Sequence, residues 1–298
     1  MGNKSYHFKI GPLTLQIKKI YYDHYFNIWS HKMDPYLTDR SDNSGDTAIT
    51  ISFANRPYPT ERKLLRCDNY GFYACYITED KNHTIYYQYM RKATKKIFFT
   101  ISVDEMHREI CLLEDHTNSY HAIPFEFLGI IIPNIILNYG FLSFHGVLME
   151  YEGNGIIISA VSGTGKTTHA RLWRDLRRAL IINGDRAVCA KTAEGWTGYG
   201  LPWSGTSGEQ INRSVTIRAL VVLRRGETNE AHRISALEAF HQVFAHVLYP
   251  SWDKALTEKM VDLLESFLRD VPIFLLSCRP EAESVDVLHD ALAEVLHE

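Results

Sequence analysis

A run of small and hydroxyl-bearing residues near the middle of the chain constrains this sequence more than any other feature. Residues 159–168 read SAVSGTGKTT, and they follow an apolar run at residues 155–158 and precede a helix-compatible run. Gly163 and Gly165 allow backbone N–H groups to turn inward around phosphate oxygens, at the point where a helix begins. The pattern is typical of a strand, a phosphate-binding loop and a helix.

The polar positions of this loop have distinct expected roles. We expect Lys166 to place its charge on the outer phosphates and Thr167 to offer a hydroxyl to a magnesium ion. Ala160 stands where such loops usually begin with glycine, and alanine is tolerated there if its φ angle is negative. A plain turn is the alternative, but it does not account for the Gly-Lys-Thr-Thr run. The residues predicted to bind the nucleotide from this loop are Ser162, Gly163, Thr164, Gly165, Lys166, Thr167 and Thr168.

Composition indicates a soluble globular protein. The 298 residues are 45% hydrophobic and 22% charged, with a formal net charge of −3, so no generic attraction to nucleic acid is expected. The five cysteines include no CxxC pair, which favours reduced thiols over disulfides or a zinc site. The first residues lack the apolar core of a signal peptide. We therefore expect a cytoplasmic protein.

The front of the chain is built from a different set of residues. Of the 17 tyrosines, 15 lie at or before Tyr151. Apolar residues often alternate on both sides of a Gly-Pro turn at residues 11–12, which predicts a hairpin over residues 6–19. Further strands are predicted at residues 49–53, 71–77, 83–90, 96–103 and 109–113. We predict a mostly antiparallel β domain over residues 1–122, suited to substrate recognition, and a second domain over residues 123–298.

Residues 124–139 are strongly apolar and invite comparison with a membrane span. Pro133, Asn134 and Asn138 interrupt the run. A span needs ~20 predominantly apolar residues, so we predict a buried helix and no membrane partner.

A hairpin over residues 141–158 is expected to deliver the phosphate loop, with His145 on its first strand. Downstream, an apolar strand at residues 180–183 ends close to Asp185. A carboxylate at a strand tip, one helix after a phosphate loop, is where a magnesium ligand belongs in nucleoside-triphosphate sites. A turn aspartate is the alternative for Asp185, and its coupling to Lys166 favours the functional interpretation.

The rest of the chain alternates strands and helices. Strands are predicted at residues 186–190, 197–201, 216–224 and 272–277, and helices at residues 235–248, 251–269 and 283–296. Arg213 ends a loop of small residues and suits phosphate oxygens through its planar guanidinium, with a surface salt bridge as an equal alternative. Arg279 is a weaker candidate for the phosphate or base end of the site.

Lys166, Thr167, Asp185 and His145 together suit phosphoryl transfer, which needs charge neutralisation and alignment more than covalent chemistry. Arg186 follows Asp185, where hydrolytic ATPases commonly place a water-activating glutamate, so transfer to a hydroxyl is favoured over hydrolysis. Asp185 or His145 is expected to take the acceptor's proton. A purely structural histidine remains the alternative for His145.

These motifs resemble a known superfamily. FHGVL at residues 144–148 and SAVSGTGKT at residues 159–167 resemble the core of HPr serine kinases and ATP-dependent phosphoenolpyruvate carboxykinases. THARLW at residues 168–173, INGDR at residues 182–186 and GLPWSG at residues 200–205 are more similar to HPr-kinase-like proteins, some of them encoded beside ribosomally made peptides. Lasso-peptide kinases of that group phosphorylate a serine hydroxyl at the C-terminal end of the precursor.

The resemblance covers about the last three-fifths of the chain and implies an α/β P-loop domain with a mixed sheet and flanking helices. It implies ATP and Mg²⁺ as cofactors, with Asp185, His145 and Lys166 catalytic and Thr167 and Asp185 on the metal. Two positions depart from the family pattern. Gly184 stands where HPr kinases typically carry the first of two aspartates, and Thr206 stands where the nearer branch often carries lysine.

We therefore expect a magnesium-dependent, ATP-using kinase that phosphorylates a serine on a peptide, such as a lasso-peptide precursor. The signature associated with HPr recognition is not evident, and residues expected for oxaloacetate binding are not found, so a carboxykinase is not expected. A kinase of a small hydroxylated metabolite or of an HPr-like protein, and a nucleotide-binding regulator without transferase activity, remain as alternatives. A homo-oligomer is left open.

Overall fold

The computed structural model describes residues 5–18, 31–38, 49–53, 62–67, 73–78, 85–91, 96–103, 109–113 and 122–297. The chain forms two compact units, residues 1–130 and 131–298, and the division falls inside helix α2 (Ala122–Ile136). Each unit has a β-sheet of its own.

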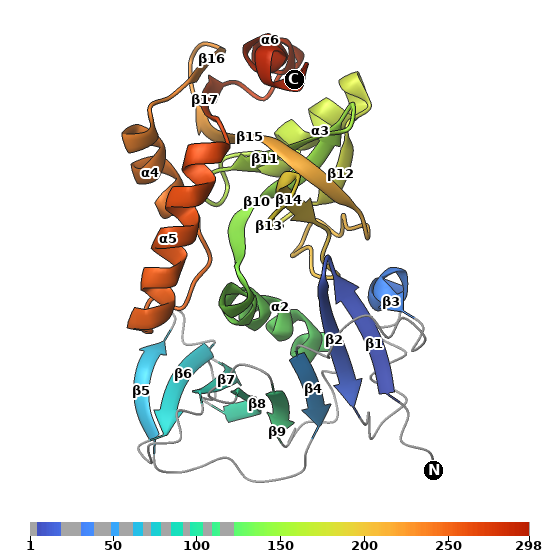
Figure 1. Cartoon of the computed structure of the whole chain (residues 1–298), viewed down its shortest axis with the longest axis vertical. Helices are drawn as coiled ribbons and strands as arrows, with labels where there is room; N and C mark the ends of the chain where they lie inside the picture. The colour runs from blue at the N-terminus through green and yellow to red at the C-terminus, as the bar shows by residue number, and fades with distance from the viewer. Residues whose placement is uncertain are drawn as a thin grey trace. The chain divides into compact units, whose positions relative to one another are not determined.

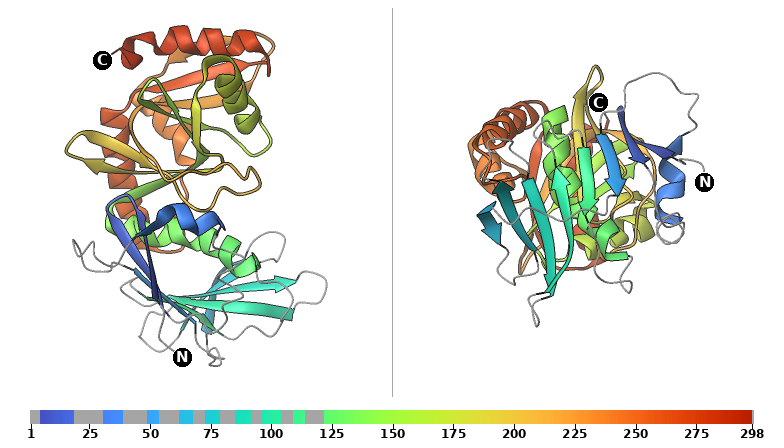
Figure 2. Two further views of the ribbon diagram at one scale, coloured as in Figure 1. Left: turned by 90° about the vertical axis from the view of Figure 1, so that its right-hand side faces the viewer. Right: turned by 90° about the horizontal axis from the view of Figure 1, so that it is seen from below.

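The described strands of the first unit lie side by side in one sheet, in the order β3-β1-β2-β4-β9-β8-β7-β6-β5 (Figure 2). The pairs β2–β4 and β4–β9 are parallel and the other described pairs are antiparallel, which confirms the mostly antiparallel prediction. The strands are β1 (Ser5–Ile10), β2 (Leu13–Lys18), β3 (Leu37–Thr38), β4 (Ile49–Phe53), β5 (Arg62–Cys67), β6 (Tyr73–Thr78), β7 (Ile85–Arg91), β8 (Lys96–Val103) and β9 (Glu109–Leu113). A short 3₁₀ helix, η1 (Asp34–Tyr36), precedes β3.

The hairpin expected over residues 6–19 is present as β1 and β2. Phe8 and Ile10 on β1 and Leu15 and Ile17 on β2 are buried, with intermediate residues between them. This period of two places one face of the hairpin in the core. Gly11 has a φ of 56° in the turn, a conformation that glycine adopts at no steric cost.

The second unit alternates strands and helices after η2 (Leu137–Tyr139). Its strands are β10 (Phe141–Tyr151), β11 (Asn154–Ser159), β12 (Leu180–Asn183), β13 (Arg186–Thr192), β14 (Gly195–Tyr199), β15 (Ser214–Arg225), β16 (Glu230–Arg233) and β17 (Ile273–Cys278). Its helices are α3 (Lys166–Arg177), α4 (Ala236–Phe244), α5 (Lys254–Asp270) and α6 (Ala282–Leu296).

The sheet of the second unit is mixed. Strands β11, β15 and β17 pair in parallel, whereas β10 runs antiparallel to β11, β12 and β13. The pairings β10–β13, β13–β14, β14–β15, β15–β11 and β11–β10 close a ring of strands. The C-terminal ends of β11, β12, β15 and β17 therefore share one edge, where ligands bind in open α/β sheets. The α/β fold with a mixed sheet and flanking helices is confirmed.

Two apolar cores lie on opposite faces of this sheet. Helices α4 and α5 pack on one face, and α3 and α6 pack on the other (Figure 1). Successive side chains of a strand point to opposite faces, so Ile157 on β11 joins the first core while Ile156 and Ile158 join the second. The loop at the end of β11 is therefore anchored from both sides.

Helix α4 is shorter than the sequence pattern predicts. It was expected to reach Leu248 but ends at Phe244. The backbone N–H of His145 donates to the carbonyl of His246 at 2.8 Å, and the N–H of Leu248 donates to the carbonyl of Ser143 at 2.7 Å. Pairing with β10 takes these residues out of the helix.

Strand β16 was not predicted, because its residues are mostly exposed and show no apolar alternation.

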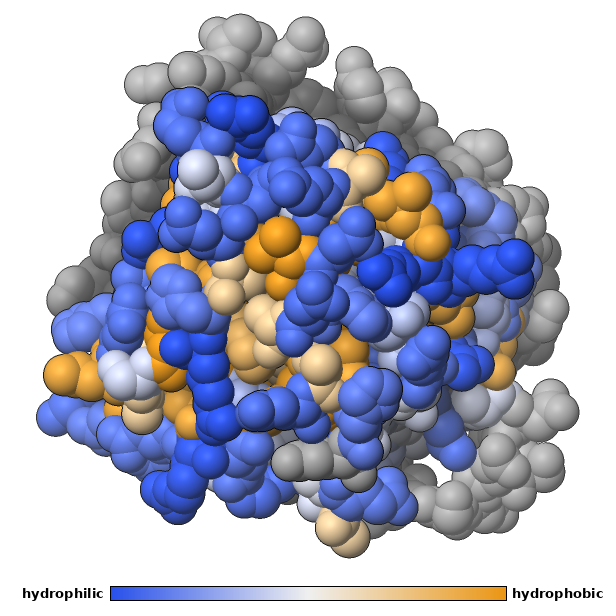
Figure 3. All heavy atoms as spheres, turned by 90° about the horizontal axis from the view of Figure 1, so that it is seen from above, coloured by the Kyte–Doolittle hydropathy of each residue, from blue (hydrophilic) through white to orange (hydrophobic). Residues whose placement is uncertain are grey.

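Figure 3 shows the face of the molecule that carries α6, where hydrophilic side chains predominate and apolar patches lie between them. Among the described residues, no helix combines the length and the apolar character that crossing a membrane requires.

Candidate active site

The loop between β11 and α3 has the backbone of a phosphate cradle. Gly163 and Gly165 have φ angles of 79° and 121°, which only glycine adopts readily. Gly165 precedes the first residue of α3 and no side chain caps the helix, so the N–H groups of its first turn remain available to an anion. Among the described residues other than glycine, only Glu152 and Arg178 have a positive φ angle. Ala160 therefore has the negative φ angle that an alanine needs at the start of this loop.

Lys166 lies buried at the start of α3. Its Nζ donates to the carbonyl of Ala160 at 2.9 Å and lies 3.1 Å from Nε2 of His145. Burial lowers the pKa of Lys166, and the nearby Asp185 carboxylate opposes that shift. The structure thus brings Lys166, His145 and Asp185 together, as the sequence led us to expect.

His145 bridges the lysine and the aspartate. A lysine ammonium can only donate, so Nε2 of His145 accepts from Lys166 and Nδ1 carries the ring hydrogen. That Nδ1 lies 3.6 Å from Oδ1 of Asp185. Burial lowers the pKa of His145, and the Lys166 cation lowers it further. The ring is therefore neutral near pH 7 and can accept a proton.

Asp185 owes its position to Asn183, which is fully buried. The side-chain oxygen of Asn183 accepts from the N–H groups of Asp185 at 3.1 Å and Arg186 at 2.8 Å. Its Nδ2 donates to the carbonyls of Leu201 at 3.1 Å and Trp203 at 2.9 Å. We did not predict Asn183 as a site residue, although an asparagine just before a strand-end turn is the sequence sign of this arrangement.

A second loop, residues 202–213, covers the carboxylate of Asp185. A Cβ added to Gly205 would lie 2.5 Å from Oδ2 of Asp185, so this glycine packs directly against the acid. On its other side, Nη1 of Arg186 lies 3.4 Å from the same oxygen. The carboxylate is therefore held between the side chains of His145 and Arg186 and the backbone of the loop at Gly205.

The same loop accounts for the glycine at position 184. A Cβ on Gly184 would lie 2.2 Å from Oγ and 2.7 Å from Cβ of Ser207. The N–H of Gly184 donates to the carbonyl of Glu209 at 3.0 Å. Ser207 thus fills the space that an aspartate at position 184 would need, and the single carboxylate at Asp185 is built into the packing.

His246 is a further residue near the cluster that sequence analysis missed. Burial lowers its pKa, and the nearby Lys166 and His145 lower it further, so the three side chains lie within electrostatic reach. The backbone bond between His145 and His246 places it there. No local pattern marks His246, because this contact joins segments far apart in the sequence.

A magnesium ion fits the oxygen donors present. Mg²⁺ binds through one or two protein oxygens together with substrate phosphates. Asp185 offers a carboxylate, and Thr167, in the first turn of α3, has no hydrogen-bond partner for its hydroxyl among the described residues. The described part of the chain holds no cluster of three His, Cys, Asp or Glu side chains, so a cation here would depend on phosphate oxygens.

The structure does not bring Arg213 to the phosphate loop. Its guanidinium forms a bidentate ion pair with Glu150. Glu150 pairs with Gly155 at the start of β11, whereas the loop follows Ser159 at the other end. The surface salt bridge, the alternative for Arg213, is what the structure contains.

A different arginine contacts the loop. Nη2 of Arg225, at the end of β15, donates to the carbonyl of Gly163 at 2.6 Å, and its Nε lies 3.4 Å from the carbonyl of Thr164. These bonds fix two carbonyls of the loop, and the N–H of Thr164 donates within the loop to the carbonyl of Val161 at 3.2 Å. Its neighbour Arg224 instead donates to Gln242 of α4 at 2.5 Å.

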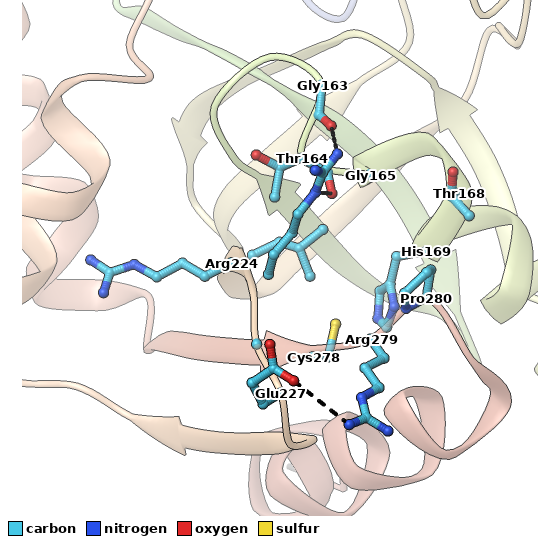
Figure 4. Close-up of a pocket in the computed structure, with 13 residues that line it drawn as sticks. Gly163, Thr164, Gly165, Thr168, His169, Arg224, Glu227, Cys278, Arg279 and Pro280 are labelled. Atoms are coloured by element: carbon cyan, nitrogen blue, oxygen red, sulfur yellow. Dashed lines mark hydrogen bonds and ion pairs between the residues drawn. The ribbon is translucent and has the colours of Figure 1, made fainter.

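A cavity of about 490 Å³ lies beside the loop, between the ends of β15 and β17 (Figure 4). Arg279, named from the sequence as a weaker candidate, is part of its wall, together with Pro280. Ser162 and Val161 line an adjoining hollow of about 500 Å³, which shares Gly163, Thr164 and Arg224 with the first cavity. The loop residues that line the first cavity are Gly163, Thr164, Gly165 and Thr168.

No family model matches the chain, and no curated protein matches it. Among solved structures, the chain is similar to the Hpr(Ser) kinase/phosphatase from Coxiella burnetii over 51% of its own length and 88% of that chain. The identity is 9% and the TM-score is 0.32. Values this low bear on neither activity nor substrate.

Proposed function

We propose that this chain is a magnesium-dependent, ATP-using kinase that phosphorylates a serine hydroxyl of a peptide. The observation that carries the proposal is the contact chain from Lys166 through His145 to Asp185, placed directly at a phosphate-binding loop. It combines a cation for the transferred phosphoryl group with two groups able to take a proton.

The chemistry follows from these positions. Lys166 and the N–H groups at the start of α3 stabilise the negative charge that spreads over the transferred phosphoryl group. Asp185 orients the acceptor hydroxyl and takes its proton, directly or through His145, as the acceptor oxygen bonds to the γ-phosphorus and ADP leaves. Thr167 and Asp185 would hold Mg²⁺, which neutralises phosphate charge when bound.

The cavity beside the loop suits the nucleoside half of ATP. It opens next to Gly163 and Thr164, so a nucleotide with its phosphates in the loop can extend into it. Arg279 and Pro280 offer a planar cation and an apolar ring against which a base can stack.

The acceptor class rests on the sequence motifs. The stretches at residues 168–173, 182–186 and 200–205 resemble HPr-kinase-like proteins, some of them encoded beside ribosomally made peptides, so the C-terminal serine of a lasso-peptide precursor is the proposed acceptor. The β-rich first unit is the proposed platform for that peptide.

The decisive experiment incubates the protein with ATP, Mg²⁺ and separate acceptors, and follows addition of one phosphoryl group by mass spectrometry. The acceptors are a precursor peptide ending in serine, the same peptide ending in alanine, free serine, a sugar and an HPr-like protein. We expect transfer only to the serine-ended peptide. Transfer only to free serine or only to the sugar would show that the acceptor is a small metabolite and not a peptide. Nucleotide binding without any transfer would favour a regulator.

Lys166→Met should abolish transfer, because the loop then lacks its cation at the phosphoryl group. We expect a loss of at least ~10²-fold in kcat, comparable to removal of one electrostatic donor at a transition state. Lys191→Met is the matched control, since Lys191 pairs with Asp270 on the surface. Turnover of the Lys166 variant at the wild-type rate would refute the proposed role.

Asp185→Asn tests the carboxylate while preserving the size of the side chain. We expect kcat to fall by ~10²–10⁴-fold, the range for loss of a general base. Titration with Mg²⁺ then separates two roles of Asp185. A weaker apparent Mg²⁺ affinity indicates a metal ligand, and an unchanged affinity with lost kcat indicates a base.

A further inference from the structure

A chain of buried hydrogen bonds connects α3 with the segment that precedes α6. Nε1 of Trp173 donates to Nε2 of His169 at 3.2 Å, and Nδ1 of His169 lies 3.3 Å from Oγ of Ser284. The Ser284 hydroxyl donates to the carbonyl of Glu281 at 2.6 Å. Trp173, His169 and Ser284 are at most 2% exposed, so the two bonds made by the His169 ring are shielded from bulk water.

The direction of each bond follows from the donors. An indole N–H only donates, so Nε2 of His169 must accept and Nδ1 must carry the hydrogen. Nδ1 therefore donates to Ser284, whose own hydrogen is directed to Glu281. His169 is 2% exposed and each of its ring nitrogens has a partner, so the packing holds the ring in this orientation.

This chain ends at the wall of the cavity beside the phosphate loop. Arg279 and Pro280 immediately precede Glu281, and His169 itself lines the cavity beside Pro280 (Figure 4). Asn229 holds the same segment from outside, because its Oδ1 accepts from the N–H of Arg279 at 3.0 Å and its Nδ2 donates to Glu281 at 2.8 Å. The wall is therefore fixed through its backbone on two sides.

The position of His169 links two parts of a nucleotide site. It belongs to α3, whose first turn forms the phosphate end, and it bonds to Ser284 of α6, which in turn bonds to the carbonyl of Glu281 beside the opposite wall. The guanidinium of Arg279 lies 3.9 Å from the exposed Glu227, a loose ion pair. The bond from His169 to Ser284, continued by the bond from Ser284 to Glu281, therefore ties the Arg279–Pro280 wall to α3.

We propose that His169 is a positioning residue that holds the Arg279–Pro280 wall, through Ser284, at the distance a nucleoside needs when its phosphates occupy the loop. This inference rests on the proposed ATP use. It assigns His169 a role in binding the nucleoside half of the ligand and none in binding the phosphate half.

Two substitutions at His169 separate this role from a general contribution to packing. His169→Asn keeps a donor near the position of Nδ1 and thus the bond to Ser284, but loses the acceptor for Trp173. His169→Gln keeps an acceptor near the position of Nε2 but loses the donor to Ser284. Both remove the ring, so their packing defects are similar. Ser284→Ala removes the partner and leaves His169 in place.

The experiment measures binding of Mg-ADP and of pyrophosphate to the full chain by titration calorimetry. We expect His169→Gln and Ser284→Ala to bind Mg-ADP about fivefold to tenfold more weakly, the effect of one buried hydrogen bond, with pyrophosphate affinity unchanged. His169→Asn should stay closer to wild type. The double variant His169→Gln/Ser284→Ala should be no worse than either single variant, because both break the same bond.

Equal losses for Mg-ADP and pyrophosphate, or wild-type affinity of His169→Gln for both, would overturn the inference while leaving ATP use intact. A wild-type protein that binds neither ligand would instead refute the proposed function and this inference with it. Circular dichroism identifies a His169 variant that does not fold, in which case Ser284→Ala carries the test.

Discussion

At the scale of single residues, the site depends on hydrogen bonds that orient groups more than on the groups alone. Lys166 is held by the carbonyl of Ala160 and by His145, and Asp185 is oriented through Asn183. Each of these donors and acceptors has a defined partner, so the site is organised before any ligand arrives. Preorganised polar groups of this kind stabilise charge that develops during a reaction.

Arg225→Gln tests the preorganisation of the loop. The substitution removes the bonds to the carbonyls of Gly163 and Thr164, so the loop's N–H groups should lose part of their alignment. A lost hydrogen bond of this kind costs about 1–2 kcal/mol, or roughly five- to thirtyfold in the KM for ATP. Arg224→Gln is the control, because Arg224 bonds to Gln242 instead. Equal KM values for the two variants would exclude this role for Arg225.

At the scale of elements, the loop at residues 202–213 decides how many carboxylates the site can hold. It packs Gly205 against Asp185 and Ser207 against Gly184. Gly184 and Gly205, which belong to different segments, therefore both lack a side chain where these two segments pack together. The departure from the two-aspartate pattern of HPr kinases is a property of this interface as a whole.

Gly184→Ala should destabilise the second unit and displace the loop, because its Cβ would meet Oγ of Ser207 at 2.2 Å. Overpacking of this kind costs about 1–3 kcal/mol in the free energy of unfolding. Adding Ser207→Gly should restore most of the stability by removing the clashing atoms. Thermal unfolding of the single and double variants measures both effects, and a double variant no more stable than Gly184→Ala would disprove the proposed packing.

At the scale of the whole molecule, stability is expected to depend on pH through His169. Its pKa falls from 6.5 to about 4 on folding, so between these values the unfolded chain binds the proton first and the folded state loses stability as pH falls. At about 1.4 kcal/mol per pKa unit, the full effect is about 3 kcal/mol. Above pH 6.5 the contribution is fully present.

Urea unfolding at pH 7.5 and pH 4.5 measures this dependence for wild type and His169→Asn. Folding also lowers the pKa values of His145 and His246, so the comparison between the proteins isolates His169. The wild-type protein should lose more stability than the variant on acidification, by up to about 3 kcal/mol. Identical losses would show that His169 is not protonated on unfolding in this range.

The sequence alone determined the phosphate loop, its flanking strand and helix, and the predicted roles of Lys166 and Asp185. Those features are local, since glycine positions, a cationic residue at a helix start and apolar periodicity act over a few neighbouring residues. The class of fold followed from the same patterns, because alternation and helical spacing specify which face of each element is buried.

The tertiary structure alone decided which distant residues complete the site. His246 lies near the site because its segment pairs with β10, and Arg225 contacts the phosphate loop because β15 ends beside it. Arg213 lies outside the site, where it pairs with Glu150. The bond from His169 to Ser284 likewise joins two helices. Long-range pairing brings these residues together, and no spacing within a single segment encodes it.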